Sequence, residues 1–285
     1  MKNLSEKDLN DPVELIKKMK LMKAQKSKEQ VWAELEQMME HPIEKGAIVK
    51  SIKFGQWSIA ASIALLVSLS VLAFLKFYTV NVECLPGEQK MAYLPDGSSV
   101  QLNAKSNVSF HPLWWKMDRE VELNGEGFFQ VKKGEKFTVV SKNGTTSVMG
   151  TSFNIFARDE DYEVTCLTGK VKVTSVVAKD EVIITPNQMV VLDQSGNLNA
   201  NLEVNAKLSV DWTIGKFVFT QTPLNKVLAE IGRRYGVEIK NTENLTQLYT
   251  GNFAKQKEIE PILDLVCKTF EIEYKKLPSG EVIMQ

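Results

Sequence analysis

The densest supply of potentially reactive side chains lies between residues 144 and 173, GTTSVMGTSFNIFARDEDYEVTCLTGKVKV. A phosphate-binding loop of the G-x-x-x-x-G-K-[ST] type needs a lysine directly after its second glycine, but Thr151 follows Gly150. The adjacent acids at 159–161 could suggest acid–base catalysis. A general acid and base, however, need carboxylates from separate segments that face one gap. We therefore interpret the three acids as a hydrated turn.

Nucleophilic and metal chemistry find no better support in the spacing of the polar residues. The sequence has no G-x-S-x-G elbow, and its histidines are His41 and His111 alone. Cys84, Cys166 and Cys267 lie far apart and form no C-x-x-C pair, which argues against a zinc site. The sequence thus predicts a protein with no catalytic, cofactor or metal site.

Overall charge excludes a further class of function. The 285 residues carry 35 basic and 35 acidic side chains, with a pI near 6.8, whereas a nucleic-acid-binding protein has an evident basic footprint. No direct nucleic-acid partner is expected. At 44% hydrophobic residues, the chain is long enough for two or three modest domains.

A long apolar segment organises the chain around it. Residues 54–75, FGQWSIAASIALLVSLSVLAFL, carry no charge and would span about 33 Å as a helix, which matches a bilayer core. The segment begins too late for a cleaved signal peptide. A buried core helix is the alternative, but such helices seldom run so long without a charged residue. Trp57 and Tyr78 near its two ends suit the aromatic belts of a membrane interface.

Lysines flanking this segment predict its orientation. Lys45, Lys50 and Lys53 precede it, while only Lys76 lies on the other side before an acid-containing stretch. The positive-inside rule therefore places the N-terminus in the cytoplasm and about 200 residues outside it. In an oxidising compartment the odd number of cysteines leaves at least one unpaired; Cys84 could form an intermolecular bridge or remain a free thiol.

The head, residues 1–53, has the pattern of two short helices. Asp11 with Pro12 could begin the first, with apolar positions such as Val13. Ser27 and Gln30 have the spacing of a capping box for the second, whose apolar residues at helical spacing are Val31, Leu35 and Met38 or Met39. Two such helices bury too little surface to be stable alone. Two interpretations stay open: the head orders on a cytosolic partner, or it is a solvated tail.

Beyond the apolar segment, residues 84–200 predict an all-β domain. Turn signals such as Asn124-Gly125 and Ser195-Gly196 recur every 8 to 12 residues and separate short alternating runs. Trp114 and Trp115, as neighbours in a strand, would point to opposite faces, one into the core and the other free to dock a partner. Core or edge packing is the favoured role of this pair.

Several linked motifs in this region resemble the FecR domain of bacterial transmembrane anti-sigma regulators. They are LPDGSSVQLNA, REVELNGEGFFQV, VMGTSFNIFA and VTCLTGKVKV, in that order. Gly127 departs from the alanine usual at its position, which we interpret as a local packing change. The resemblance implies a β-helix-like stack of short strands. The motif positions with an expected structural role are Asp96, Gly97, Gly125, Phe128, Phe129, Gly150, Thr151, Phe153 and Gly169.

Residues 211–285 predict a small α+β domain made of two βαβ-type units. In the first unit we expect a strand from Asp211, a helix capped by Thr222 with Pro223 at its first position, and a stop at Gly236. The stripe of that helix is Leu224, Val227, Leu228 and Ile231. In the second unit, Cys267 falls on the apolar stripe of the helix and is expected in the core.

A second resemblance covers this region. Trp212, Pro223, Leu224 and Tyr235 match the C-terminal domain that accompanies FecR domains, especially in Bacteroidetes-type regulators, and that domain is similar to the secretin and TonB short N-terminal (STN) fold. The expected organisation is a cytoplasmic anti-sigma head (1–53), a transmembrane helix (54–75), a periplasmic FecR domain (84–200) and an STN-like domain (211–285).

The two resemblances imply a function. A protein of this family sequesters an extracytoplasmic-function sigma factor at the inner membrane, here through Val31, Trp32 and Leu35, and relays a signal from a TonB-dependent outer-membrane transporter whose signalling domain it contacts. Release is expected to involve a membrane-embedded protease. The alternative class is a membrane-anchored cell-envelope hydrolase or carbohydrate-binding protein, in which Trp114 and Trp115 would stack on sugar.

Overall fold

The computed structural model describes residues 26–40 and 54–285, and it divides the chain into two compact units, Met1–Ile63 and Ala64–Gln285. The predicted first helix of the head, with Asp11 and Pro12, and the flanking residues Lys45, Lys50 and Lys53 lie outside the described residues. Each unit is described by itself below.

The helix of the head, α2 (Lys28–Glu40), begins with the predicted capping box. The Gln30 amide nitrogen lies 3.4 Å from Ser27 Oγ, and the Ser27 amide donates to Gln30 Oε1 at 3.0 Å. These two contacts satisfy backbone donors that a helix start leaves free. An exposed ion pair between Lys26 and Glu34 (2.6 Å) also braces the first turns.

The apolar segment forms α3 (Phe54–Phe77), and none of its most apolar part, Trp57–Phe77, is buried. A core helix would be covered by other elements, so the exposed surface of α3 is consistent with a single membrane span instead. Its serines satisfy their hydroxyls within the helix: Ser62 donates to the Ser58 carbonyl and Ser70 to the Leu66 carbonyl, both at 2.8 Å. Internal bonds of this kind suit an apolar surrounding.

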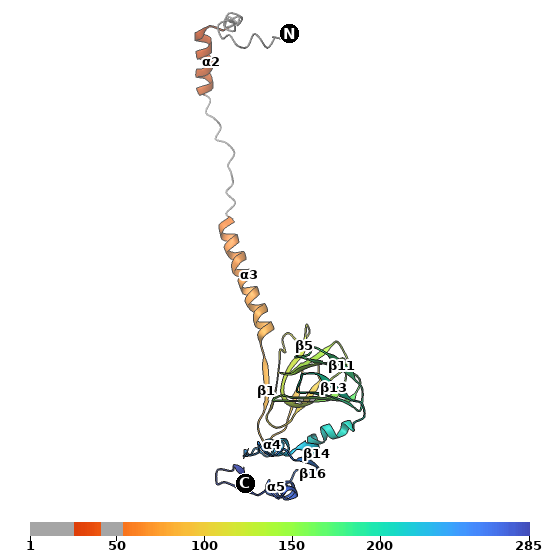
Figure 1. The fold of residues 1–285 in the computed structure, drawn as a ribbon. Helices are drawn as coiled ribbons and strands as arrows, with labels where there is room; N and C mark the ends of the chain where they lie inside the picture. The colour runs from red at the N-terminus through yellow and green to blue at the C-terminus, as the bar shows by residue number, and fades with distance from the viewer. Residues whose placement is uncertain (1–25, 41–53) are drawn as a thin grey trace, which may run out of the picture. The chain divides into compact units, whose positions relative to one another are not determined.

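Thirteen strands after α3 form one large sheet, which we call the β-domain (residues 80–201), and Figure 1 shows them curving around a common interior. The central path runs β11-β10-β7-β6-β5-β8-β9-β12-β13, and β11 comes close to β12 and β13, so the sheet nearly closes into a barrel. The strands are β1 (Val80–Cys84), β2 (Lys90–Tyr93), β3 (Ser99–Leu102), β4 (Ser106–Phe110), β5 (Arg119–Gln130), β6 (Phe137–Val140), β7 (Gly144–Val148), β8 (Ser152–Arg158), β9 (Asp161–Thr168), β10 (Val171–Ser175), β11 (Glu181–Ile184), β12 (Gln188–Leu192) and β13 (Leu198–Asn201).

The predicted all-β character of this region is confirmed, and period-two alternation explains its core. In β10, Val171 and Val173 are fully buried while Lys172 between them is exposed. The rings of Phe129 and Phe153, from the paired strands β5 and β8, stack at 5.1 Å in the same core. One buried face per strand therefore builds the interior of the barrel.

The β-helix-like stack implied by the resemblance does not match the pairing. A β-helix stacks parallel strands in successive coils, whereas β5 and β6 are the parallel neighbours in the β-domain and its other pairs are antiparallel. Short turns such as the one at Gly169 join consecutive strands, and such turns produce antiparallel pairs. The correct description is a nearly closed, mainly antiparallel barrel.

Trp114 and Trp115 lie in a turn between β4 and β5, so the expectation of a strand there was wrong. The Met117 amide donates to the Trp114 carbonyl (2.9 Å), which closes a helical turn. Trp115 is nevertheless in the core, edge-on to the rings of Phe110 and Phe137, and Trp114 is half-buried. The prediction of one core tryptophan is confirmed.

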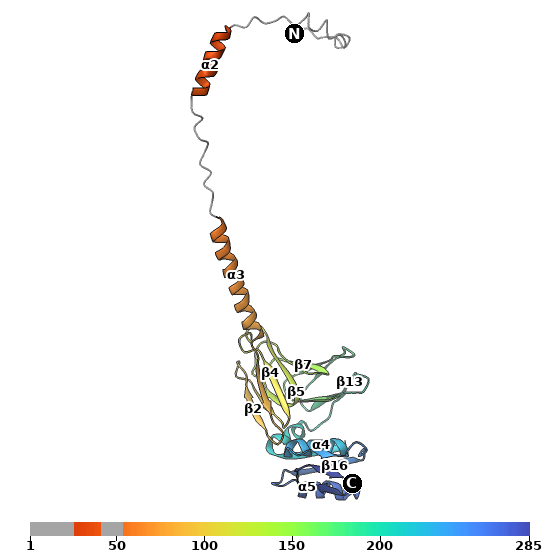
Figure 2. The same cartoon turned by 90° about the vertical axis from the view of Figure 1, so that its left-hand side faces the viewer.

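The remaining elements, η2 to β18, form what we call the C-terminal domain (residues 206–285), a small α+β fold. Leu224, Val227, Leu228 and Ile231 of α4 are buried as predicted and pack on the strands behind that helix. In Figures 1 and 2, α4 lies between the β-domain and the layer of β16 and α5. The elements are η2 (Ala206–Ile214), β14 (Lys216–Pro223), α4 (Leu224–Tyr235), β15 (Ile239–Lys240), β16 (Leu248–Ala254), α5 (Glu260–Cys267), η3 (Lys268–Phe270), β17 (Tyr274–Lys276) and β18 (Val282–Met284).

Two local expectations in this domain were wrong. Residues 211–214 belong to the 3₁₀ helix η2 and not to a strand. Thr222 does not cap α4: Pro223 is the N-cap, and the Leu224 and Asn225 amides donate to the Gln247 and Leu245 carbonyls at 2.8 Å. A neighbouring segment thus satisfies the free donors of the helix start. The predicted stop at Gly236 is confirmed, with the left-handed conformation of a C-cap.

All three cysteines are free and buried. Cys84 is 1% exposed, which rules out the intermolecular bridge considered from the sequence. Cys267 packs in the core of the C-terminal domain as predicted. Burial raises the pKa of the Cys166 and Cys267 thiols to about 11, so both are inert at neutral pH.

Candidate functional site

Two regions of the molecule have the character of functional sites, and the first is the apolar face of α2. Its five large apolar side chains lie on one side of the helix at i, i+3, i+4 and i+7 spacing, and no described residue covers them. Their exposed fractions are Val31 44%, Trp32 64%, Leu35 45%, Met38 76% and Met39 80%. A contiguous apolar face on so short a helix is typical of a partner-binding surface.

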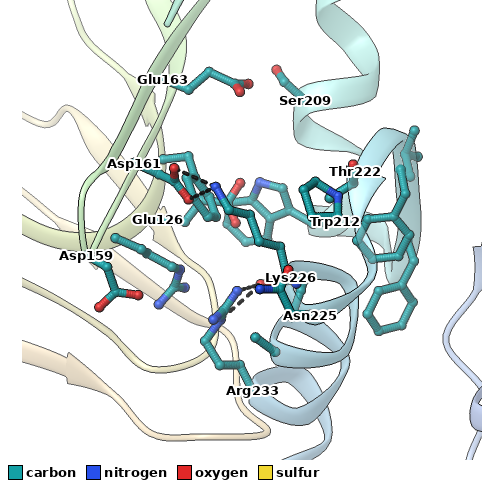
Figure 3. Close-up of a pocket in the computed structure, with 18 of the residues that line it drawn as sticks. Glu126, Asp159, Asp161, Glu163, Ser209, Trp212, Thr222, Asn225, Lys226 and Arg233 are labelled. Carbon is teal, nitrogen blue, oxygen red and sulfur yellow. Dashed lines mark hydrogen bonds and ion pairs between the residues drawn. The ribbon is translucent and has the colours of Figure 1, made fainter. Parts of the chain in front are cut away.

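The second region is the junction between the β-domain and the C-terminal domain. A cleft of about 890 Å³ lies there, with residues of β5, β8 and β9 on one side and of η2, β14 and α4 on the other (Figure 3). Twelve of its lining side chains are acids or bases, among them Glu126, Asp161, Lys226 and Arg233, and Trp212 hydrogen-bonds across the two domains. We call this set of contacts the junction.

Glu126, in the middle of β5, is the most deeply buried acid of the junction, at 7% exposure. Gly125 before it adopts a positive φ of 108°, and a Cβ there would lie 2.4 Å from Ser106 Oγ. That hydroxyl accepts the Glu126 amide at 2.9 Å. Burial, followed by the charge of Glu230, raises the pKa of Glu126 to about 7.

An asparagine bridges the two domains through their acids. Asn103 Nδ2 donates to Glu126 Oε2 (2.7 Å) within the β-domain and to Glu230 Oε1 (3.0 Å) on α4. Arg233, one turn further along α4, donates to Glu230 Oε2 from Nη2 at 2.8 Å and from Nε at 3.1 Å. The charge of Glu230 is thereby balanced by Arg233, while Glu126 has two amide donors and a raised pKa.

Trp212 on η2 completes the buried part of the junction. Its indole Nε1 donates to Asn154 Oδ1 at 3.2 Å, and Asn154 Nδ2 donates in turn to Glu126 Oε1 at 3.0 Å. Gln89 Nε2 donates to the Trp212 carbonyl at 2.7 Å. The ring is 6% exposed, so it combines apolar burial with bonds to the β-domain.

The rim of the junction is charged and wetter. Lys226 on α4 pairs with Asp161 at 2.6 Å, as Figure 3 shows, and both side chains are about half exposed. Half-buried Glu163 on β9 has its pKa raised to about 7 by burial and then by the charges of Glu126 and Asp161. The expected hydrated turn is correct for Asp159 and Glu160, which are exposed, but Asp161 serves as an interdomain contact.

The chemistry of the junction is that of binding and not of bond cleavage. It holds acids with raised pKa values but no nucleophile paired with a base. Within residues 26–40 and 54–285, no group of His, Cys, Asp and Glu could hold a metal ion. What the arrangement can do is fix one domain on the other, through the bonds of Asn103, Asn154 and Trp212 and the ion pair of Lys226.

The nine positions of the FecR-like motif lie outside the cleft. Asp96 accepts the Ser98 amide (2.8 Å) and Arg119 Nε (2.9 Å); burial raises its pKa, but these bonds outweigh burial and lower it overall. Gly97, Gly150 and Gly169 lie at turns with positive φ, and Thr151 Oγ1 donates to the Lys170 carbonyl at 3.1 Å. Phe128 is half-buried; Phe129 and Phe153 are in the core, and Gly125 and Phe153 directly neighbour the junction residues Glu126 and Asn154.

The four C-terminal motif positions divide between cleft and core. Trp212 and Pro223 line the cleft, Leu224 is fully buried, and Tyr235 stacks on Phe217 and donates from its hydroxyl to the Gln256 carbonyl at 3.0 Å. Asn103 and Glu126 lie within the motifs that resemble the FecR domain, but no contact of theirs was predicted from the sequence, and Glu230 was not singled out. Their partners lie 23 to 127 positions apart, so no local pattern could bring them together.

Comparison with known proteins identifies both domains. The sequence model of the FecR protein family matches residues 80–172, and that of the FecR C-terminal domain matches residues 216–284; together they cover more than half of the chain. No curated protein matches the sequence significantly. Two crystal structures of a candidate anti-sigma factor from Parabacteroides distasonis, at 2.50 and 1.65 Å, are similar to this chain. Each is 26% identical, with TM-scores of 0.66 and 0.65, and they cover 73% and 72% of this chain and 98% of their own.

Proposed function

Since the chain belongs to the FecR family, a non-enzymatic regulatory family, and carries a FecR C-terminal domain, we propose that it is an anti-sigma factor that sequesters an extracytoplasmic-function sigma factor at the inner membrane. The similarity to the Parabacteroides structures supports this role. Function then depends on what the head can capture and on what the outer domains can sense.

The observation that carries the proposal is the uncovered apolar face of α2. Leu35 lies at its centre, with Val31 on one side and Trp32 at the other margin, and their exposed fractions of 45%, 44% and 64% leave the surface available. A large aromatic ring beside aliphatic side chains is the composition of a binding hot spot. We propose that this face docks in an apolar groove of the sigma factor, in the helix-in-groove mode.

The membrane arrangement follows from α3. In our proposal residues 1–53 are cytoplasmic, 54–75 span the inner membrane, and the FecR domain (84–200) and STN-like domain (211–285) are periplasmic. The exposed apolar surface of Trp57–Phe77 supports a single span. A reporter that is active only in the periplasm, fused after Gln285, tests the orientation: activity is expected, and its absence would reverse the topology.

For the signal, we propose that the C-terminal domain receives the signalling domain of a TonB-dependent outer-membrane transporter. The two-stranded β14–β16 sheet offers edges for strand addition, and Leu248 at one end of β16 is 60% exposed. Cleavage by a membrane-embedded protease would then release the sigma factor. If isothermal calorimetry detects no binding of any such signalling domain to the full chain, this half of the proposal fails.

Capture of the sigma factor by the full chain in detergent tests the proposal that the apolar face of α2 binds it. We expect Trp32→Ala combined with Leu35→Ala to abolish co-purification of the sigma factor. Gln37→Ala is the matched control, because Gln37 lies on the opposite side of the same helix and is also exposed. Equal capture by both variants would contradict the assignment of this face.

The rival carbohydrate-binding interpretation loses the feature that suggested it. Trp115 is 5% exposed and packs between Phe110 and Phe137, so the tryptophan pair cannot present two rings to a sugar. No observation on the described residues favours that function over the regulatory one.

A further inference from the structure

One end of the β-domain is tied directly to the end of the apolar helix. α3 ends at Phe77, and His111 Nδ1 lies 3.1 Å from Thr79 Oγ1 and 3.3 Å from the Tyr78 carbonyl oxygen. Three residues of extended chain reach at most about 10 Å. The segment that follows β4, residues 111–118, therefore begins within about 10 Å of the last residue of the span, and we call it the juxtamembrane loop.

The juxtamembrane loop exposes apolar side chains that nothing described covers. Leu113 is 49% exposed and Met117 75%, while buried Trp115 anchors the loop to the core of the β-domain. Backbone bonds from Met117 and Asp118 to the Trp114 carbonyl (2.9 and 3.2 Å) hold the loop in a fixed turn. Half-buried Trp114 lies between Leu113 and Met117 in the sequence, and tryptophan is enriched at membrane interfaces.

A neighbouring turn adds positive charge to the same end. Arg119, directly after the loop, donates to the Lys132 carbonyl at 3.2 Å and to the Glu135 carbonyl, which joins the turn at 132–136 to the loop. Four acids lie at the same end against five basic side chains: Asp96, which pairs with Arg119, and Asp118, Glu120 and Glu135. The four lysines here are exposed and form no ion pair among the described residues: Lys116, Lys132, Lys133 and Lys136.

We propose that the juxtamembrane loop and the 132–136 turn dock on the surface of the bilayer that α3 spans, with anionic phospholipid headgroups as the ligand. Leu113 and Met117 would enter the boundary between headgroups and acyl chains, and the lysines would lie at the phosphates. Continuity with the span favours lipid over a protein partner, because His111 is held at the membrane boundary whatever else the domain contacts. The inference rests on the membrane span of the proposed function.

Docking would give the outer part a defined orientation. Without it, residues 78 and 79 would be the only link between the span and the β-domain. When the loop is bound to lipid, the β-domain cannot rotate freely about the end of α3. A force on the C-terminal domain is then transmitted through the β-domain to the membrane. The docked surface therefore belongs to the signalling path although it touches neither proposed protein partner.

Spin labels on the full chain in lipid nanodiscs test the proposal. The three native cysteines are buried, so Met117→Cys labels selectively, and Val177→Cys is the matched control. Val177 is 69% exposed, close to the 75% of Met117, but it follows β10 at the opposite end of the sheet. In nanodiscs containing phosphatidylglycerol we expect the label at 117 to be accessible to oxygen and shielded from a water-soluble nickel complex, and the label at 177 to show the reverse.

Equal accessibility at 117 and 177 would overturn the proposal. A third label, Leu69→Cys within α3, separates the causes: a lipid-immersed label at 69 with a water-exposed label at 117 refutes docking alone, whereas a water-exposed label at 69 refutes the span itself. Replacing the four lysines by glutamine should shift the label at 117 toward water while circular dichroism stays unchanged. An unchanged label at 117 would refute recognition of anionic headgroups.

Discussion

The head and the junction each contain a tryptophan, and the two rings occupy opposite environments. Trp32 on α2 is 64% exposed among other uncovered apolar side chains, whereas Trp212 on η2 is 6% exposed and donates to Asn154. An apolar face left in water gains free energy when a partner covers it. A buried polar network with satisfied bonds instead fixes one arrangement of the parts it joins.

The difference separates two roles within one chain. The acids and amides of the junction bond within the molecule: Glu126, Asn103 and Glu230 find their hydrogen-bond partners in the two domains. No described residue covers the apolar face of α2, and in our proposal the sigma factor does. We therefore expect substitutions in the junction to change stability and those on α2 to change partner binding.

Trp212→Ala should lower the free energy of unfolding more than any other substitution proposed here. Removing a buried tryptophan typically lowers the free energy of unfolding by about 3–5 kcal/mol, and here it also leaves Asn154 Oδ1 without its donor. Trp32→Ala, at an exposed position, should change it by less than about 0.5 kcal/mol. Urea denaturation of the full chain followed by circular dichroism measures both. Equal losses of unfolding free energy for the two variants would show that the burial and hydrogen bonds of Trp212 do not stabilise the protein.

Glu126→Ala should be the next largest change. Asn103 Nδ2 would keep Glu230 as its acceptor, but Asn154 Nδ2 would lose its acceptor in a buried site, with a cost of about 1–3 kcal/mol. Glu122→Ala is a matched control, because Glu122 is exposed on the same strand. The same denaturation measurement applies, and a cost no greater than that of the control would show that the network does not stabilise the junction.

Stability should also depend on pH near neutrality. Glu126 and Glu163 have pKa values of about 7 in the folded protein, against a reference of 4.5, so the folded state binds more protons in this interval. The free energy of unfolding then falls as pH rises from about 4.5 to about 7.

Glu163→Gln isolates one part of that pH dependence. Glutamine cannot ionise, so the variant should lose less stability than the parent when pH is raised from about 5.5 to about 8. Thermal melts at the two pH values measure the difference. A parent protein that becomes more stable over this interval would contradict the sign of both pKa shifts.

The smallest effect belongs to the rim. Asp161 and Lys226 form a half-exposed ion pair, and such pairs contribute less than about 1 kcal/mol and weaken with salt. Lys226→Ala should therefore lower stability slightly at low ionic strength and not at all in high salt. A large, salt-independent loss would mean that the rim and not the buried network holds the domains together.

Local patterns predicted the elements better than the site. The Ser27–Gln30 capping box and the alternation of Val171 and Val173 depend on neighbours in sequence, and both are present in the structure. The cap at Thr222 failed because carbonyls from another segment, Leu245 and Gln247, satisfy the helix start. Tertiary contacts decide such cases.

The contacts of the junction could not be predicted from local sequence patterns, because they too join residues far apart in the sequence. Alternation on β5 marks Val121, Leu123 and Phe129 as buried, but nothing in the pattern shows that Glu126 turns inward among amides from other strands. Trp212 was recognised through family resemblance, and its partner Asn154 lies 58 positions away. The role of a buried acid can be assigned only when the structure shows its hydrogen-bond partners.

Calorimetry of sigma-factor binding by the full chain, with Trp32→Ala and Trp212→Ala measured side by side, tests whether the α2 face alone captures the partner. We expect Trp32→Ala to weaken binding by at least about tenfold, the effect of losing one hot-spot side chain. Trp212→Ala should leave the affinity unchanged although the protein is less stable. Unchanged affinity in Trp32→Ala would show that this face does not bind the sigma factor.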